Sequence, residues 1–181
     1  PKSNNFLASL HFAGTVGLSL LDISTGEFLI AEGDIEYTAK LLDNFSPNEV
    51  LITKENKKHF VNSYGDSFNL FFLDEWVFNL DYANDLLKKQ FETSSLKGFG
   101  IDDLNNGIIS SSAIMHYLNE TQHERLNHIT SIKRIPKEGH VWLDRFTIRN
   151  LELFRPNSVE GKCLIDVIDR TSVSYTHLRA H

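Results

Sequence analysis

The sequence contains one cysteine, Cys163, among 181 residues. A single cysteine forms no internal disulfide, which excludes the disulfide-stapled class of small secreted domains and fits a reducing compartment. Cys163 lies in an apolar stretch without a candidate base, so we interpret it as a small buried hydrophobic residue. No apolar run approaches the ~20 residues that cross a bilayer, and Pro1–Asn5 does not resemble a signal peptide. These absences predict a cytoplasmic protein without a membrane partner.

Basic segments are missing as well. The formal net charge is −6, and Lys and Arg form no block anywhere in the sequence. Because phosphate contacts supply most of the affinity of proteins for nucleic acid, a DNA-binding surface is typically marked by a stripe of Lys and Arg. We therefore expect this chain by itself to bind DNA weakly. The hydrophobic share of 41% is sufficient for a packed core, and the length suits one domain plus part of another.

Nucleotide-binding motifs are also absent. No stretch matches G-x-x-x-x-G-K-[ST], because Gly161-Lys162 has Pro156 where the first glycine is required. Gly98-Phe99-Gly100 has Asp103 at the position of the third glycine and follows no predicted strand, so it does not match the dinucleotide-binding fingerprint. The sequence predicts no cofactor-binding residue in this chain.

Three histidines, His116, His123 and His128, lie within one stretch. Zinc ligands on a helix are spaced three or four residues apart, whereas these spacings are seven and five. We interpret the three as solvated polar residues and predict no metal site.

A hairpin pattern is the strongest positive feature. The apolar runs Val16–Ile23 and Phe28–Ala31 flank Ser24-Thr25-Gly26, and the glycine supplies the positive φ of a tight reversal. Strands that are apolar on both faces belong in the middle of a covered sheet. We predict that this hairpin is the central element of an α/β domain.

Further strands and helices follow from the period of the apolar residues. In chain order the pattern predicts strand Phe6–Phe12, the hairpin, a helix from Asp34 to Phe45, strand Glu49–Thr53, helix Lys54–Tyr64, strand Phe68–Leu73, a helix begun by Asp74-Glu75, and a helix from Leu104 to Gln122. The second-last helix should pack on the sheet through the stripe Trp76, Leu80, Ala83, Leu87 and Phe91. An antiparallel meander followed by strand–helix units is typical of an RNase H-like fold, a mixed sheet flanked by helices. The fold alone implies no activity.

The sequence changes character after His123. Residues 124–139 are polar and contain Pro136 and Gly139, so we predict a linker after a domain at residues 4–123. Residues 140–171 carry too few apolar side chains for a core of their own, which predicts the incomplete start of a helical domain. Residues 172–181 show no apolar periodicity, and we interpret them as a non-native tail.

Asp22 is the one carboxylate predicted at the end of a central strand. In a nuclease of this fold such a carboxylate binds divalent metal together with two or three others. Asp34, Asp74 and Asp102 are the candidates, but none lies mid-strand, and the first two resemble helix caps. Asp-x-Ser-Thr-Gly is also ordinary turn chemistry, which we favour. A metal-dependent nuclease centred on Asp22 is the alternative hypothesis, and a pure protein-interaction module is a further one.

Five strings in one fixed order carry a family resemblance. They are LLDISTGEFLIAE (Leu20–Glu32), SLKGFGIDDL (Ser95–Leu104), HYLNETQ (His116–Gln122), LDRFTIRNLEL (Leu143–Leu153) and LIDVIDRT (Leu164–Thr171). Each string alone is modest evidence, but in series with matching gaps they resemble the MutS family of DNA mismatch repair proteins. The resemblance covers nearly all of residues 4–171.

This resemblance implies a role inside a larger protein. Residues 4–123 would be a connector domain, RNase H-like but without nuclease activity, and residues 140–171 would begin the core or lever domain. The whole protein would be a homodimer that binds mismatched duplex DNA, and ATP with Mg²⁺, through other domains, in the bacterial cytoplasm and at the nucleoid when acting. A MutL-like protein is the implied partner on the connector. No catalytic, cofactor-binding or metal-binding residue of the family is carried onto this chain, which is expected to be non-enzymatic.

Overall fold

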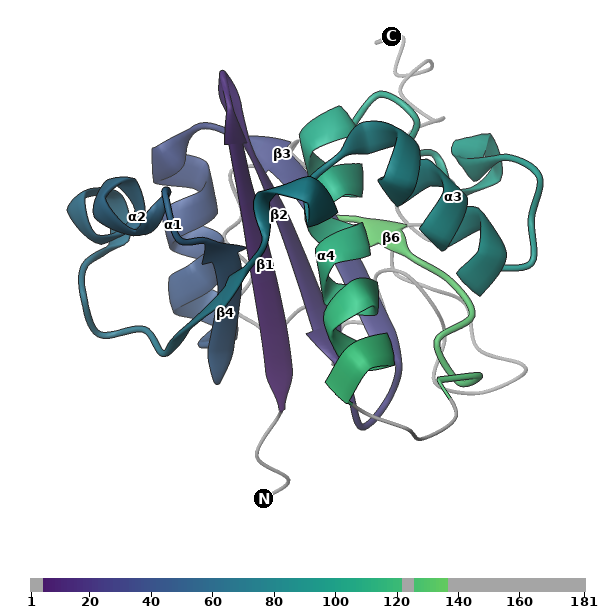
Figure 1. The fold of residues 1–181 in the computed structure, drawn as a ribbon, viewed down its shortest axis with the longest axis horizontal. Coiled ribbons are helices and arrows are strands. Elements are labelled where there is room, and N and C mark those ends of the chain that lie inside the picture. The colour runs from purple at the N-terminus through teal and green to yellow at the C-terminus, as the bar shows by residue number, and fades with distance from the viewer. Residues whose placement is uncertain (1–4, 122–125, 137–181) are drawn as a thin grey trace, which may run out of the picture. The chain divides into compact units, whose positions relative to one another are not determined.

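One mixed sheet organises the computed structural model, which describes residues 5–121 and 126–136 (Figure 1). Its strands are β1 (Phe6–Ala13), β2 (Thr15–Asp22), β3 (Glu27–Gly33), β4 (Glu49–Thr53), β5 (Leu70–Leu73) and β6 (Lys133–Arg134). The order across the sheet is β5-β4-β1-β2-β3-β6. Neighbours among β1, β2 and β3 are antiparallel, whereas β4 pairs parallel with β1, β5 with β4, and β6 with β3.

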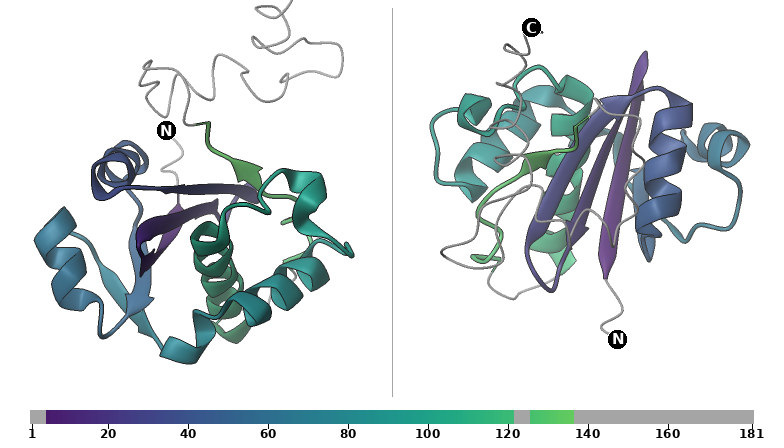
Figure 2. Two further views of the ribbon diagram at one scale, coloured as in Figure 1. Left: turned by 90° about the horizontal axis from the view of Figure 1, so that it is seen from above. Right: turned by 180° about the vertical axis from the view of Figure 1, so that it is seen from behind.

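Helices cover both faces of this sheet (Figure 2). They are α1 (Ile35–Phe45), α2 (Lys57–Tyr64), α3 (Leu80–Gln90) and α4 (Asn105–Thr121), with the 3-10 turns η1 (Glu75–Val77) and η2 (Leu96–Phe99). One face carries α1 and α2. The other face carries α4, which packs on β1 and β2, and α3 packs on α4. The sheet is therefore buried on both sides, as expected for a strand set with few polar positions.

The predicted α/β class and RNase H-like sheet are confirmed. The predicted hairpin is β2–β3, and β1 completes the antiparallel meander. Helical crossovers then place β4 and β5 parallel to β1. Leu18, Leu20 and Leu21 are completely buried, so β2 is apolar on both faces, as predicted for a central strand. The expected lever helices at residues 140–171 and the tail at 172–181 lie outside the described residues.

Helix α4 approaches β2 unusually closely, and two glycines allow it. A Cβ on Gly17 would stand 2.0 Å from the backbone carbon and oxygen of Asn106, and a Cβ on Gly107 would stand 2.7 Å from Cγ1 of Ile30. The buried hydroxyl of Ser111 is satisfied inside the helix, because it donates to the Gly107 carbonyl at 2.8 Å. Small residues on both elements thus allow α4 to pack against the sheet at unusually short distance.

The helix predicted from Asp74 begins later than expected. Asp74 makes no side-chain cap bond and is followed by η1, whereas α3 begins at Leu80. Asn79 supplies the cap, because its Oδ1 accepts a hydrogen bond from the Tyr82 backbone N–H at 3.1 Å. Trp76 precedes the helix and is 58% exposed, so its predicted place on the buried stripe is wrong.

The rest of that stripe contacts a different partner from the predicted one. Ala83 and Leu87 are fully buried, but α3 packs mainly on α4 rather than on the sheet. Phe91, which caps the C-terminal end of α3, reaches the sheet, with its ring 6.4 Å from that of Phe28. The spacing correctly predicted which side of the helix is buried. It could not reveal that the longer α4 occupies the sheet face.

Residues 126–136 belong to the domain rather than to a linker. Leu126, Ile129 and Ile132 are buried, and β6 pairs parallel with β3. Gln90 Nε2 donates to the carbonyls of Leu126 and Ile129 at 3.1 and 2.9 Å. The prediction of a linker over residues 124–139 is therefore wrong for the described part of that range. The prediction failed because the stretch is polar on average, although three of its apolar residues, spaced three positions apart, are buried.

Candidate functional site

Asp22 ends β2 and is almost fully buried, with 2% of its surface exposed. Its Oδ1 accepts a hydrogen bond from the Ser24 backbone N–H at 3.0 Å. Its backbone carbonyl accepts from the N–H groups of Thr25 at 3.3 Å and Gly26 at 2.8 Å. Gly26 has φ +75°, in the left-handed region that glycine enters without strain. Asp22 thus closes the β2–β3 turn, which is the turn role favoured from the sequence.

Asp34 lies at the opposite end of the hairpin from Asp22. It follows β3, whose last residue pairs with Val16, six positions before Asp22 on β2. Six strand residues span about 20 Å, so the two carboxylates cannot share a metal ion. Asp34 instead caps α1, because its Oδ1 accepts from the Tyr37 backbone N–H at 2.8 Å. The helix-cap interpretation of Asp34 is confirmed.

Asp74 and Asp102 are also remote from Asp22. Strand β5 runs parallel to β1, so Asp74, which follows β5, lies toward the C-terminal end of β1. Asp22 instead pairs with Phe6, the first residue of β1, at the other end of the sheet. Asp102 is exposed and precedes α4, whose first turn meets β2 at Gly17. Within residues 5–121 and 126–136, no three His, Cys, Asp or Glu side chains are grouped so that they could bind a metal ion. The carboxylates of the nuclease hypothesis are therefore not brought together.

The two described histidines of the candidate set lie apart and have separate partners. His116, on α4, has its Nδ1 2.8 Å from the Tyr82 hydroxyl. His128 is exposed, and its Nε2 lies 2.9 Å from the Ile23 carbonyl oxygen. The solvated interpretation suits His128 but not His116, which is half-buried among aromatic rings. His123 lies outside the described residues.

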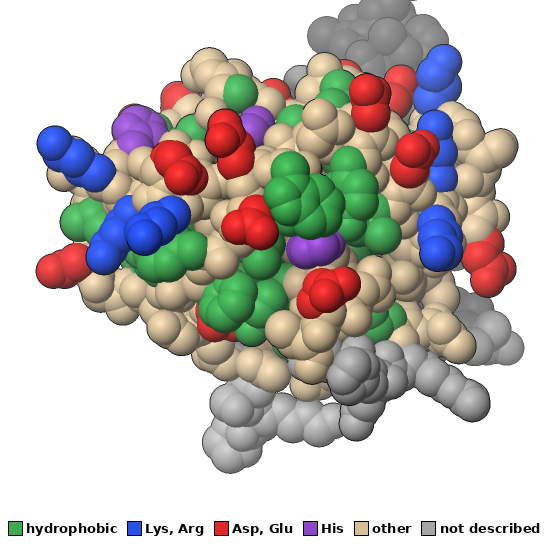
Figure 3. All heavy atoms as spheres, viewed as in Figure 1, with side chains coloured by type: hydrophobic (Ala, Val, Ile, Leu, Met, Phe, Trp, Pro, Cys, Tyr) green, Lys and Arg blue, Asp and Glu red, His purple; other side chains and the backbone are tan. Residues whose placement is uncertain are grey.

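A partly exposed aromatic cluster, which we name the Trp76 patch, consists of the exposed Trp76 and the half-buried Tyr82 and His116. The Trp76 ring lies edge to face with Tyr82 at 5.4 Å and with His116 at 5.2 Å. Burial raises the pKa of the Tyr82 hydroxyl, and the charge of Glu120 raises it further. Figure 3 shows hydrophobic side chains and a histidine gathered between carboxylates on this face of the molecule. Sequence reasoning missed the patch because the spacing of Trp76 matched the buried stripe.

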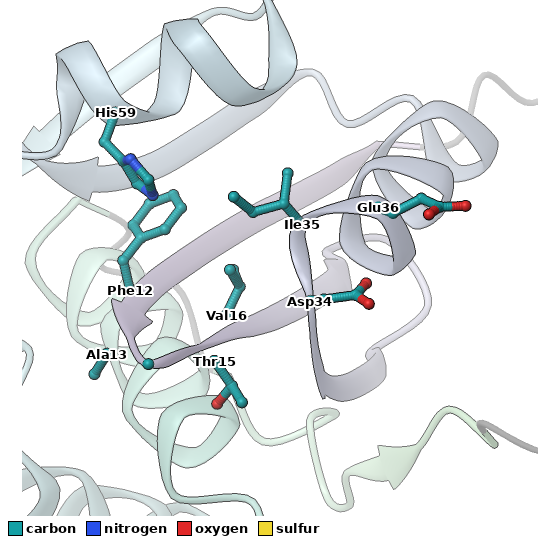
Figure 4. A pocket seen from close by; sticks show the side chains of 9 residues that line it. Phe12, Ala13, Thr15, Val16, Asp34, Ile35, Glu36 and His59 are labelled. Atoms are coloured by element: carbon teal, nitrogen blue, oxygen red, sulfur yellow. The ribbon is translucent and has the colours of Figure 1, made fainter.

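A shallow hollow lies between the β1–β2 turn, the start of α1, and α2 (Figure 4). Phe12, Val16 and Ile35 supply its apolar lining, and the Phe12 ring meets the His59 ring edge to face at 4.8 Å. The carboxylate of Asp34 points away from this lining and is already bound as a helix cap. Glu36 also lines the hollow, but its carboxylate is paired with Lys40 at 2.7 Å, so the described lining presents a mainly apolar surface.

The remaining sequence candidates lie in a short helical turn or outside the described residues. Gly98 and Phe99 lie in η2 and Gly100 caps it, with φ +67° and its N–H donating to the Lys97 carbonyl at 3.0 Å. Gly161-Lys162 and Cys163 lie outside the described residues. Within the ranges that the structure describes, no helix combines the length and the apolar character needed to cross a membrane.

Known proteins match nearly the whole chain. The family model described as MutS domain II matches residues 5–130. The chain is 54% identical over 171 residues to the DNA mismatch repair protein MutS of Flavobacterium psychrophilum, and 55% identical over 171 residues to that of Parabacteroides distasonis. The corresponding protein of Cytophaga hutchinsonii is 53% identical over the same length.

These alignments cover 94% of this chain but only 20% of each relative, so the chain spans about a fifth of their length. The family match takes in all of the sheet except β6, together with the four helices of the described domain. This agrees with the order of strings found in the sequence. On these grounds the chain belongs to the MutS domain II family.

Proposed function

We propose that this chain is the connector part of a mismatch repair protein and carries no catalysis itself. In this role residues 5–136 form a strut between a mismatch-binding module and the lever that begins in residues 140–171. The observation that carries the proposal is the similarity over 171 residues to proteins named DNA mismatch repair protein MutS, of which the chain spans 20%.

The packing of the domain supports a mechanical role. The contact of Gly17 with the first turn of α4 is so close that even an added methyl group would overlap the backbone of Asn106. Asp22 and Asp34 are bound as turn and cap residues, so neither carboxylate is left for metal-dependent chemistry. A tightly packed sheet and helix suit the transfer of a displacement from one end of the domain to the other.

We further propose that mismatched duplex DNA, ATP and Mg²⁺ bind the whole protein through segments other than the residues described here, and that the whole protein is a homodimer. The net charge of −6 supports the proposal that other segments bind DNA and ATP, because a phosphate-binding surface favours positive charge. We place the protein in the bacterial cytoplasm, at the nucleoid when it acts.

A chimera tests the connector proposal. Residues 5–171 would replace the matching segment of the full-length Flavobacterium johnsoniae relative, which is 53% identical to this chain over 171 residues. In a bacterium that lacks its own MutS, the chimera should restore a low spontaneous mutation frequency. A chimera that carries Gly17→Ala should not restore it, whereas one with Gly98→Ala should. A folded, stable chimera that left the mutation frequency high would overturn the proposal.

The nuclease hypothesis has a separate test. The 181-residue chain would be incubated with Mn²⁺ and nicked or branched DNA, beside the Asp22→Asn variant. We expect no cleavage by either protein. Cleavage by the parent chain that disappears in Asp22→Asn would support the nuclease instead.

Protein docking is a second proposed role, and the Trp76 patch favours it. Exposed tryptophan and tyrosine are typical anchors of protein interfaces. We propose that a MutL-like protein contacts this patch. In a pull-down with purified MutL of the same bacterial group, Trp76→Ala should reduce retention, and Ile35→Ala, another exposed apolar residue, should not. Equal retention of both variants would remove the patch from this role.

A further inference from the structure

Strand β5 is an open edge of the sheet: among the described residues, β4 is its only neighbouring strand. The backbone N–H of Val50 donates to the Asn69 carbonyl at 2.8 Å, which fixes the side of this segment that faces β4. The N–H and C=O of one strand residue point to the same side of the strand, and those of the next residue point to the opposite side. Phe71 therefore faces β4 with its N–H and C=O, and Leu70 and Phe72 direct theirs outward.

The side chains of β5 leave this edge unprotected. Phe71 and Phe72 are 39% and 38% exposed, one on each face of the sheet. The Phe71 ring contacts Tyr117 edge to face at 4.8 Å. The strand itself contains no charged residue and no proline, the devices that usually protect an edge from further pairing. Unpaired backbone groups beside exposed aromatic rings are the features of a strand-addition site.

The charge beside the edge indicates what kind of strand fits. Lys57 Nζ lies 5.9 Å from the centroid of the Phe72 ring, on the face that carries α2. Lys54 and Lys58 are exposed in the same segment, and Glu55 is the single carboxylate among residues 54–58. Lys57 therefore places a positive charge beside Phe72, whereas on the other face the Phe71 ring meets Tyr117, whose hydroxyl donates to the Glu49 carboxylate at 2.9 Å.

We propose that the outer edge of β5 binds an extended segment of a partner polypeptide, which adds a strand to the sheet and alternates acidic with apolar side chains. Its backbone pairs with Leu70 and Phe72. Its acidic side chains lie over Lys57, and its apolar side chains lie over Phe71 and Tyr117. This inference goes beyond the proposed connector role, because it depends on the open edge of β5 and on the flanking residues Lys57 and Tyr117.

A peptide titration tests the proposal on the 181-residue chain. The probe is the acetylated and amidated heptapeptide Ser-Val-Glu-Val-Glu-Val-Ser, whose glutamates share one face. Backbone NMR should show saturable shifts and slower hydrogen exchange at the amides of Leu70 and Phe72, and no change at Lys133, on the opposite edge. The same peptide with two successive central residues N-methylated should not bind, because successive N–H groups point to opposite sides and one of the two is a ladder donor in either strand direction. The peptide with lysine in place of glutamate should bind at least about fivefold more weakly, a difference of about 1 kcal/mol.

Matched variants of the chain separate backbone pairing from side-chain contact. Phe72→Pro removes an outward N–H without removing a bond to β4, so binding should be lost, whereas Phe72→Ala should keep part of it. Lys57→Glu changes an exposed residue, so the variant should fold like the parent chain. It should bind the lysine peptide more tightly than the glutamate peptide, which tests the proposal even if Phe72→Pro does not fold.

Four outcomes would overturn this inference. The first is equal binding of the N-methylated peptide, and the second is unchanged exchange at Leu70 and Phe72 at saturating peptide. The third is dimerisation of the chain through β5, detected by sedimentation velocity and lost in Phe72→Pro, since the occupant would then be a second copy. The fourth is the same set of amide shifts on addition of duplex DNA.

Discussion

Glu32 on β3 caps helix α4 through Asn106, although 74 positions separate them in the sequence. Glu32 Oε2 accepts hydrogen bonds from the backbone N–H groups of Asn106 at 3.0 Å and Gly107 at 3.2 Å. Its Oε1 accepts from the Thr15 hydroxyl at 2.7 Å, and Asn106 Nδ2 donates to the Ala13 carbonyl at 3.0 Å. The first N–H groups of a helix lack partners within it and carry partial positive charge. A carboxylate from the sheet satisfies two of them and fixes the start of α4 beside the β1–β2 turn.

The substitution Glu32→Ala should lower the free energy of unfolding by about 1–2 kcal/mol, because it leaves two helix donors without their carboxylate. Urea unfolding at pH 7 measures this. The matched control is Glu36→Ala, which breaks an exposed pair with Lys40 and should change the free energy by less than about 0.5 kcal/mol. Equal effects of the two substitutions would show that the cap is unimportant.

Gly17→Ala should destabilise the domain by about 3 kcal/mol or more, since the added methyl group would overlap the backbone of Asn106. A Cβ at Gly98 would meet no atom within 4 Å, so Gly98→Ala should leave the melting temperature nearly unchanged. Circular dichroism melting of both variants makes the comparison. A Gly17→Ala variant with the melting temperature of the parent would mean that α4 does not lie this close to β2.

The helix α3 should be held by its contact with α4. Leu87 is completely buried, and Leu87→Ala should cost about 2–5 kcal/mol. Leu80 is only partly buried, so Leu80→Ala should cost less. Trp76→Ala removes a larger but mostly exposed side chain and should cost under about 1 kcal/mol. Chemical denaturation of the three variants should give this order, and a larger loss for Trp76→Ala than for Leu87→Ala would contradict it.

The stability of the domain should depend on pH through His11. Its ring stacks on Phe78 at a centroid distance of 5.9 Å, and its Nδ1 is buried without a hydrogen-bond partner among the described residues. Burial lowers the pKa of His11 from the ordinary value of 6.5, and the charge of Glu32 opposes this in part. The unfolded chain therefore binds the proton more readily than the folded one. As the pH falls through 6.5, the unfolding free energy should fall with it.

Urea unfolding between pH 8 and pH 5 should separate this effect from that of the other titrating groups. The parent chain should lose more stability than His11→Gln below pH 6.5, and the difference between the two should be constant above pH 7.5. The other groups are common to both proteins, so they cancel in the difference. Parallel curves over the whole range would show that His11 is not responsible.

Residues 126–136 should be needed for full stability. A chain that ends at residue 136 should melt at a higher temperature than one that ends at residue 123, because the shorter chain loses β6 and the buried Ile129 and Ile132. Burial of each such side chain contributes roughly 1.5–3 kcal/mol. The control is Ile129→Ala in the full chain, which removes part of the same buried contact without shortening the chain. This variant should also melt at a lower temperature than the parent. Identical melting of both truncated chains would restore the linker interpretation.

Local sequence determined the turns and helix ends of this protein. The β2–β3 turn follows from Asp22 and Gly26, because Asp22 accepts hydrogen bonds from the N–H groups of Ser24, Thr25 and Gly26. Helix α1 begins at the Asp34 cap and ends at Ser46, whose N–H donates to the Leu42 carbonyl at 2.8 Å. Each of these features depends on groups two to four residues apart. The order of elements then limited the topology, and with it the RNase H-like sheet.

Tertiary structure decided what those elements contact. The same apolar stripe could pack on a sheet or on another helix, and only the position of α4 assigns Leu87 to the second of these. Strand β6 is two residues long and has no strand pattern of its own, so it forms only because β3 offers an edge. Glu32 is an ordinary strand carboxylate until the fold brings Asn106 to it. Periodicity reports which side of an element is apolar, but pairing over 74 positions depends on the packing of the whole chain.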